Sequence, residues 1–318
     1  MTLARGARVS LLAEMDAWLA GAVGRVASLR PLAGGYSNDN ALVVTEAGER
    51  YVLRRYRGHN ACAVEAALAR RLTGVVPVAE VVAADPSGER AGEPVLVCRF
   101  MPGTLVGDLL PGLAPAPASA LGRAAGTALA AIGSVTFDRP GFFDAALVPG
   151  PPGLEPTGGL GEFVERCLGT GNAGAALSDA EQDGLRDLAR RWEPGLASLH
   201  GSRQLVHADF NPKNLLASLV AGQWRISAVL DWEFAFSSSP LYDVGNMLRH
   251  ERPAGFVNGF LAGYAENGGY LPPDWRQHSR ALDLFSLADL LTRPADHRYF
   301  RKSVATIRRL LGEGDQVG

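Results

Sequence analysis

About two thirds of the way along the chain, the sequence reads His207-Ala-Asp-Phe-Asn-Pro-Lys-Asn214 and, shortly afterwards, Leu230-Asp-Trp-Glu233. The residues between these two segments predict a β-hairpin, because apolar runs at 215–219 and 224–230 flank Ala221-Gly222-Gln223. Within the second run, apolar residues occupy every other position, as a half-buried strand requires: Trp224, Ile226, Ala228 and Leu230.

A hairpin returns its two ends to the same place, and here both ends carry polar side chains. Asn214 comes just before the first strand and Asp231 just after the second, while Asp209 lies in a polar loop upstream. We therefore expect Asn214 and Asp231 to lie side by side, with Asp209 close by. Three oxygen-bearing side chains at strand ends indicate a hard-cation site, which we assign to Mg²⁺ bound together with substrate phosphates.

The pattern of the chain changes near Met101. Before it, five segments favour strands: 29–33, 41–45, 51–56, 78–84 and 94–100. Two segments favour helices: 61–72, and the N-terminal stretch in which Leu11, Leu12, Met15, Trp18 and Leu19 follow helical spacing. After it, helical patterns dominate, including one that opens with the capping-box spelling Ser178-Asp-Ala-Glu181. We predict an α+β fold with two lobes: residues 1–100, rich in antiparallel β-structure, and residues 101–318, mainly helical.

The composition excludes several classes of protein. A net charge of −2 and a pI of about 6.3 provide no basic surface for nucleic acid or an anionic membrane. Cys62, Cys98 and Cys167 have no metal-ligand or disulfide spacing. No segment has the pattern of a membrane span, and Glu14 and Asp16 interrupt the apolar N-terminal stretch that a secretion signal would need. We expect a cytoplasmic protein, monomeric or weakly dimeric.

The spelling H-x-D-x-x-x-x-N, a strand and then D-W-E resembles the phosphotransferase family of aminoglycoside and choline kinases, whose fold is similar to that of protein kinases. The resemblance covers roughly residues 29–311. It implies that Asp209 is the catalytic aspartate, which orients a substrate hydroxyl and accepts its proton, and that Asn214 and Asp231 hold Mg²⁺ on the phosphates of ATP. Positioning and charge neutralisation are what phosphoryl transfer mainly needs from a protein.

Three residues near these motifs have supporting or open roles. His207 has a pKa suited to a general base, but it could equally bond nearby backbone, and the resemblance implies the structural role. Asp243 resembles a residue that is buried in the family and supports the catalytic loop. Lys213 either contacts phosphate or is solvated.

A glycine-containing turn between two predicted strands is the candidate phosphate loop. Gly34 and Gly35 let the backbone approach a phosphate, and successive N–H groups there form a nest for anions. A Gly-Gly pair is common in hairpins, so it is weak evidence alone. The resemblance implies phosphate binding at this turn, with Ser37 and Asn38 taking part.

The family's next strand carries a lysine, and here an arginine stands in its place. Of the 31 basic residues only Lys213 and Lys302 are lysines, so any cation on this strand is an arginine. Val52 and Arg54 share one face of a strand, which predicts Val52 against adenine and Arg54 at the phosphates. Glu65 on the following helix is the expected partner of Arg54, the alternative being a solvated glutamate.

The resemblance implies that backbone groups of about Arg99 to Met101 bind adenine, and that the acceptor site lies in the helical lobe. The acceptor is a small-molecule hydroxyl compound: an aminoglycoside, another antibiotic, or a metabolite such as a sugar or amino alcohol. Five acidic residues of the helical lobe are candidates for contacting a polycationic acceptor, although the ordinary interpretation of each is a solvated charge on a helix surface: Glu251, Asp274, Asp283, Asp289 and Asp296. The missing lysine also leaves open a nucleotide-binding protein with little transfer activity.

Overall fold

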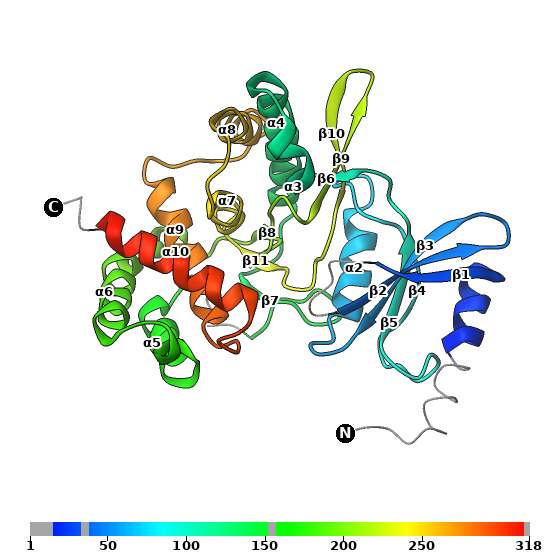
Figure 1. Cartoon of the computed structure of the whole chain (residues 1–318), viewed down its shortest axis with the longest axis horizontal. Helices are drawn as coiled ribbons and strands as arrows, with labels where there is room; N and C mark the ends of the chain where they lie inside the picture. The colour runs from blue at the N-terminus through cyan, green and yellow to red at the C-terminus, as the bar shows by residue number, and fades with distance from the viewer. Residues whose placement is uncertain (1–14, 33–37, 152–156, 315–318) are drawn as a thin grey trace. The chain divides into compact units, whose positions relative to one another are not determined.

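The computed structural model describes residues 15–32, 38–151 and 157–314. The chain separates into two compact units, and each is described by itself (Figure 1). The first unit comprises Met1–Pro111, Phe143–Val148 and Lys213–Phe234; the second comprises Gly112–Phe142, Pro149–Pro212 and Ala235–Gly318. The division into a nucleotide lobe of residues 1–100 and an acceptor lobe of residues 101–318 stays a prediction.

An antiparallel five-stranded sheet forms the centre of the first unit, in the order β1-β2-β3-β5-β4. Its strands are β1 (Val26–Pro31), β2 (Asn38–Thr45), β3 (Arg50–Tyr56), β4 (Val81–Asp85) and β5 (Val95–Arg99). One helix covers each face: residues 15–23 on one and α2 (Cys62–Leu72) on the other (Figure 1). The strands and the α2 helix agree with the predicted segments.

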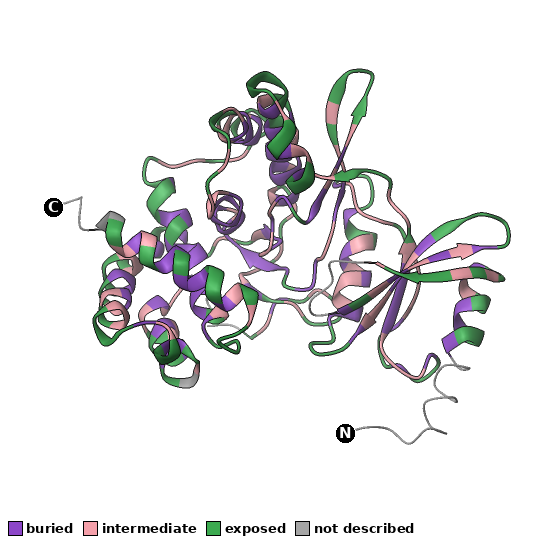
Figure 2. Cartoon of the chain, in the orientation of Figure 1, coloured by how far each residue is buried: buried purple, intermediate pink, exposed green. Residues whose placement is uncertain are grey.

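Side-chain alternation along β3 explains which residues lie on which face. Tyr51 and Leu53 are buried with the helix of residues 15–23, whereas Tyr56 is buried with α2. In Figure 2 the strands of this sheet include buried stretches. Because the period of a strand is two, Arg54 lies on the α2 face and Arg55 on the opposite one. The predicted shared face of Val52 and Arg54 agrees with this arrangement, and the role of Arg54 at the phosphates stays a prediction.

The predicted hairpin belongs to the first unit. It consists of β9 (Leu215–Val220) and β10 (Gln223–Val229), and β6 (Thr104–Leu105) adds a third strand before the short helix α3 (Val106–Leu109). Ala221 and Gly222 form the turn with φ values of 50° and 79°. Positive φ at both turn residues defines a two-residue loop whose twist matches that of the strands. Gly222 meets this requirement without steric cost.

The second unit is mainly helical. Its α-helices are α4 (Pro115–Gly133), α5 (Leu160–Thr170), α6 (Asp179–Leu196), α7 (Leu241–Leu248), α8 (Ala254–Glu266), α9 (Trp275–Leu290) and α10 (Arg298–Gly314). Short 3₁₀ turns occur at Ala173–Ala175 and Ala197–Leu199, and another, Leu110–Gly112, lies where the chain leaves the first unit. A small antiparallel sheet, ordered β7-β11-β8, contains β7 (Gly141–Phe142), β8 (Gln204–Val206) and β11 (Phe236–Ser238). Ser178 and Glu181 form the predicted capping box of α6.

Helices α4 and α8 pack backbone against backbone through glycines. A Cβ atom added to Gly259 would lie 2.0 Å from the carbonyl oxygen of Ser119, and one added to Gly126 would lie 2.0 Å from that of Phe260. Only glycine permits so close an approach. No described helix combines the length and apolar character needed to cross a membrane.

Candidate active site

The hairpin brings the two predicted metal-binding residues of the first unit to the same end. The N–H of Leu230 donates to the carbonyl oxygen of Asn214 at 2.8 Å, so the backbones of Asn214 and Asp231 are neighbours, as the sequence predicts. Asp231 has a φ of 68°, in the left-handed region. A non-glycine residue there stores strain, which is typical of functional turns.

Arg54 binds three carboxylates, one of which belongs to Asp231. Its Nη2 donates to Asp231 Oδ1 at 2.6 Å and to Glu233 Oε2 at 3.1 Å. The same nitrogen lies 3.3 Å from Glu65 Oε1. The side chains of Arg54 and Glu65 are about nine-tenths buried, whereas that of Asp231 is 34% exposed. The predicted Arg54–Glu65 pair is confirmed, and Asp231 and Glu233 join it.

The charges of this cluster are unbalanced. Burial raises the pKa of Glu65 to about 8; Arg54 opposes this increase, while Asp231 and Glu233 add to it. Burial disfavours the charged form of Arg54, but the carboxylates of Glu65 and Asp231 outweigh it and raise its pKa. Three carboxylates facing one guanidinium therefore leave an excess of negative charge, partly relieved when Glu65 holds a proton.

The donor atoms of the cluster suit a hard cation. Carboxylate oxygens of Glu65, Asp231 and Glu233 lie within 4.8 Å of one another. Asn38 donates through Nδ2 to Glu233 Oε2 at 2.6 Å, and its own Oδ1 is buried without a hydrogen-bond partner among the described residues. Oxygen donors of this kind are the ligands that Mg²⁺ prefers. The residues present therefore fit a magnesium ion.

Other predicted nucleotide-binding residues are spread along the sheet. Val52 is half-buried on β3, on the face that carries Arg54. Arg99, at the end of β5, pairs with Glu80 at 2.9 Å and is half-exposed. The N–H groups of Arg99 and Phe100 donate to Glu80 O and Arg50 O, at 2.9 and 3.0 Å, and the half-buried Met101 follows them. Gly34, Gly35 and Ser37 lie outside the described residues.

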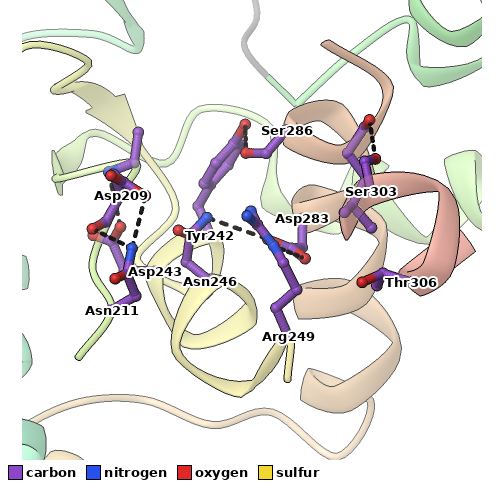
Figure 3. Close-up of polar contacts among 12 residues, drawn as sticks. Asp209, Asn211, Tyr242, Asp243, Asn246, Arg249, Asp283, Ser286, Ser303 and Thr306 are labelled. Atoms are coloured by element: carbon purple, nitrogen blue, oxygen red, sulfur yellow. Dashed lines mark hydrogen bonds and ion pairs between the residues drawn. The ribbon is translucent and has the colours of Figure 1, made fainter. Parts of the chain in front are cut away.

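Asp209 lies in the second unit, in a loop after β8 that Figure 3 shows beside α7. Asn211 Nδ2 donates to Asp209 Oδ1 at 2.7 Å and to its carbonyl oxygen at 2.9 Å. The N–H of Asp209 donates to Nδ1 of His207, which is fully buried. His207 thus has the structural role rather than that of a base, and its ring shapes the turn that presents Asp209.

Asp243, in the first turn of α7, anchors the same loop through hydrogen bonds. Its two carboxylate oxygens accept hydrogen bonds from the N–H groups of His207 and Ala208, both at 2.8 Å. Ala208 has a φ of 66°, a strained conformation that these bonds stabilise. Burial raises the pKa of Asp243 to about 7. The negative charge of Asp209 raises this pKa as well, whereas the two N–H donors lower it. Asp243 is the buried support that the sequence predicts.

Sequence reasoning missed three contributors. Glu233 and Asn211 each lie two residues after a predicted site residue and contact the same partner or that residue itself, but both segments are irregular, so no strand or helix period signals them. Arg249 binds Asp283 through Nε and Nη2, at 2.8 and 2.6 Å, and Figure 3 shows this pair between α7 and α9. Asp283 is 4% exposed, so the interpretations as a solvated charge and as a free carboxylate for the acceptor are both wrong.

The fold and these two sets of residues define a class of enzyme: kinase-like phosphotransferases with an antiparallel sheet followed by a helical part. The model of the phosphotransferase enzyme family matches residues 28–280, and the chain belongs to this family. The predicted α+β kinase-like fold and the assignment as a phosphotransferase enzyme are both confirmed.

Solved structures with the same fold include antibiotic phosphotransferases. Aminoglycoside phosphotransferase APH(4)-Ia aligns with a TM-score of 0.70 and 18% identity, over 95% of this chain and 99% of that one. Macrolide 2′-phosphotransferase MphH from Brachybacterium faecium aligns with a TM-score of 0.66 and 20% identity, over 93% and 97%. A thermostable form of APH(4)-Ia in a ternary complex with ADP and hygromycin B has a TM-score of 0.69 and 19% identity, over 96% and 99%. No curated protein matches the chain.

Proposed function

We propose that this protein transfers the γ-phosphate of ATP to a hydroxyl group of a small molecule, in the manner of an antibiotic kinase. The observation that carries the proposal is the placement of Asp209, whose carboxylate is fixed by Asn211 in a loop anchored to Asp243. A carboxylate held this way is ready to orient a hydroxyl and to accept its proton. The complexes of APH(4)-Ia with ADP, AMP-PNP and hygromycin B support a nucleotide and a small-molecule acceptor as substrates.

Each predicted residue then has a task. Asn214 and Asp231 would hold Mg²⁺, which neutralises charge on the phosphates when bound. Arg54, kept in position by Glu65 and Glu233, is the cation for the phosphates and replaces the lysine of the family.

The remaining nucleotide contacts lie along the sheet. Val52 packs against adenine, and the N–H of Met101 binds its edge, because the N–H of Arg99 already donates within the sheet. The turn containing Gly34 and Gly35, with Ser37 and Asn38, binds the phosphates.

A nucleotide-binding protein with little transfer activity is the second candidate. The observation that favours it is the 2.6 Å ion pair between Arg54 and Asp231, which occupies an oxygen of a proposed metal ligand. The intact pair of Asp209 and Asn211 favours transfer instead, since nucleotide binding alone needs neither. Nucleotide-dependent thermal stabilisation fits both candidates, so turnover of an acceptor has to separate them.

The experiment is an ATP-consumption screen over a broad panel of hydroxyl compounds, with Asp209→Ala as the background. ATP consumption counts as a hit only if it requires the added compound and is absent in Asp209→Ala. Asp209→Ala should still bind Mg-nucleotide, which calorimetry would show. Full turnover in Asp209→Ala would refute the mechanism, and nucleotide binding without any acceptor-dependent turnover would favour the second candidate.

A further inference from the structure

The segment that follows α7 gathers cations within the second unit. Arg249 and Arg252 come from this segment, and the exposed Lys302 comes from α10. Arg309 also reaches the segment, where its Nη2 donates to the carbonyl oxygen of Arg249 at 2.5 Å. The C-terminal carbonyls of a helix favour a nearby cation, and Arg249 and Arg309 satisfy that preference. Arg252, which is half-buried, needs another explanation.

Arg252 is the unusual member of the group. It is half-buried, its Nε is buried without a hydrogen-bond partner, and it forms no ion pair among the residues that the structure describes. Asp283, the buried carboxylate nearby, is taken up by Arg249, and Glu251 is exposed and pairs with neither arginine. Burial and the charge of Arg249 lower the pKa of Arg252. A partly desolvated charge without a counter-charge is unfavourable.

The pKa of His250 reflects the same local positive charge. Burial lowers its pKa to about 4, and Arg249, Arg252 and Lys302 lower it further, with only Asp283 opposing them. These residues therefore lie close enough to act on one another. At neutral pH His250 is an uncharged hydrogen-bond donor or acceptor near Arg252 and Lys302, neither of which forms an ion pair with a described residue.

This group is linked to Asp209 through one helix. The first turn of α7 carries Asp243, which holds the catalytic loop, and the segment after its last turn begins with Arg249. Eight helical residues span about 12 Å, so the two ends are within reach of one small molecule. The charge of Asp209 also acts on Arg249, which confirms their proximity.

We propose that Arg252 and Lys302, with His250 beside them, bind an anionic group of the acceptor, a carboxylate or a phosphate. The inference rests on the proposed function, because it names the acceptor class of that same site. A bound anion supplies the counter-charge that Arg252 lacks and accepts a hydrogen bond from its Nε. A polycationic aminoglycoside would meet two unpaired cations here and be repelled. The acceptor is therefore an anionic hydroxyl compound, unlike hygromycin B.

The first test measures binding of an anion without catalysis. Inorganic phosphate is titrated calorimetrically into the full-length protein with its nucleotide site saturated by Mg-ADP; acetate is the carboxylate probe in a parallel titration. Arg252→Gln should weaken binding about tenfold or more, and Arg252→Lys less, because it keeps the charge. Arg301→Gln, an exposed arginine beside Lys302, is the matched control and should stay within about twofold.

Equal affinity in the wild type and in Arg252→Gln, or no saturable binding in the wild type, would overturn the proposal. Thermal unfolding of each variant checks its fold. Because Arg252 is unpaired, removal of its charge should leave the unfolding midpoint unchanged or raise it. A preference for phosphate over acetate, or the reverse, identifies which anionic group the site accepts.

The second test uses one hydroxyl scaffold in three charge states: glucosamine, glucose, and the anions glucuronate and glucose 6-phosphate. The anionic members should be the better acceptors, and Arg252→Gln should raise KM for them about tenfold with kcat within about twofold. Turnover of glucosamine or hygromycin B that Arg252→Gln leaves unchanged would refute this inference while the proposed function stands. Phosphate binding that depends on Arg252, without turnover of any acceptor, would refute the proposed function but support the anion site at Arg252.

Discussion

Replacing Arg54 should destabilise the first unit far more than replacing its neighbour Arg55. Arg54→Gln removes a cation that pairs with Glu65, Asp231 and Glu233 at once. Removing one partner of a buried ion pair costs roughly 3–5 kcal/mol, because it leaves a buried charge uncompensated. Asp231 is 34% exposed and Glu65 takes up a proton readily, so we expect the lower end of that range.

Arg55→Gln is the matched control, since it changes the same residue type on the same strand. Arg55 lies on the opposite face, is 30% exposed and pairs with Glu93, which keeps its second partner, Arg57. A partly exposed pair contributes about 0–1 kcal/mol. The two variants should therefore differ by about 2 kcal/mol or more in the free energy of unfolding.

Urea unfolding followed by circular dichroism measures this difference, provided that the slopes of the transitions agree. Adding Glu233→Gln to Arg54→Gln should restore part of the lost stability, because it removes one of the carboxylates that have lost Arg54. In parallel, Arg54→Ala should cost far more ATP turnover than Arg55→Ala. Equal destabilisation by the two Gln variants, or the reverse order of activities, would show that the wrong arginine has been identified.

The other predictions concern the second unit. Gly259→Ala should lower stability by about 1–3 kcal/mol, since its Cβ would lie 2.0 Å from Ser119 O, whereas Gly169→Ala, with open space around it, should be neutral or stabilising in the same unfolding assay. Asn211→Ala should reduce kcat about tenfold or more without moving the thermal midpoint, because it releases Asp209 Oδ1. Asp243 has a raised pKa, so its contribution to stability is complete below about pH 4 and is lost as the pH rises through about 7. The stability of the wild type relative to Asp243→Asn should therefore decrease over that range, and a difference that grows with pH would show that the two N–H donors outweigh burial.

Local patterns in the sequence were sufficient for much of the fold. The hairpin could be predicted from alternation and from its turn residues, and it determines that Asn214 and Asp231 are neighbours. The face of Arg54 follows from the period of β3 alone. These features depend on residues close together in the chain, which is why periodicity predicts them.

Long-range pairing could not be predicted in the same way. Asp283 has the spelling of a helix-surface charge, but it is buried because Arg249, 34 residues away, pairs with it. Glu233 likewise acquires its role only when β3 brings Arg54 within 3.1 Å. Both cases depend on which charges the fold removes from water together, and no local pattern encodes that choice.

The arginine at position 54 has a consequence that a lysine would not share. Burial and two nearby carboxylates raise the pKa of Glu65 to about 8, so the proton content of the cluster changes near neutral pH. A buried lysine shifts its own pKa readily and would lose charge in the same surroundings, whereas a guanidinium stays protonated. Arg54 therefore keeps one fixed positive charge beside Asp231 whichever form Glu65 adopts. Under the proposed function, an arginine in place of the lysine gives the phosphates a cation of constant charge, and its cost is that Arg54 competes with the proposed metal ion for Asp231.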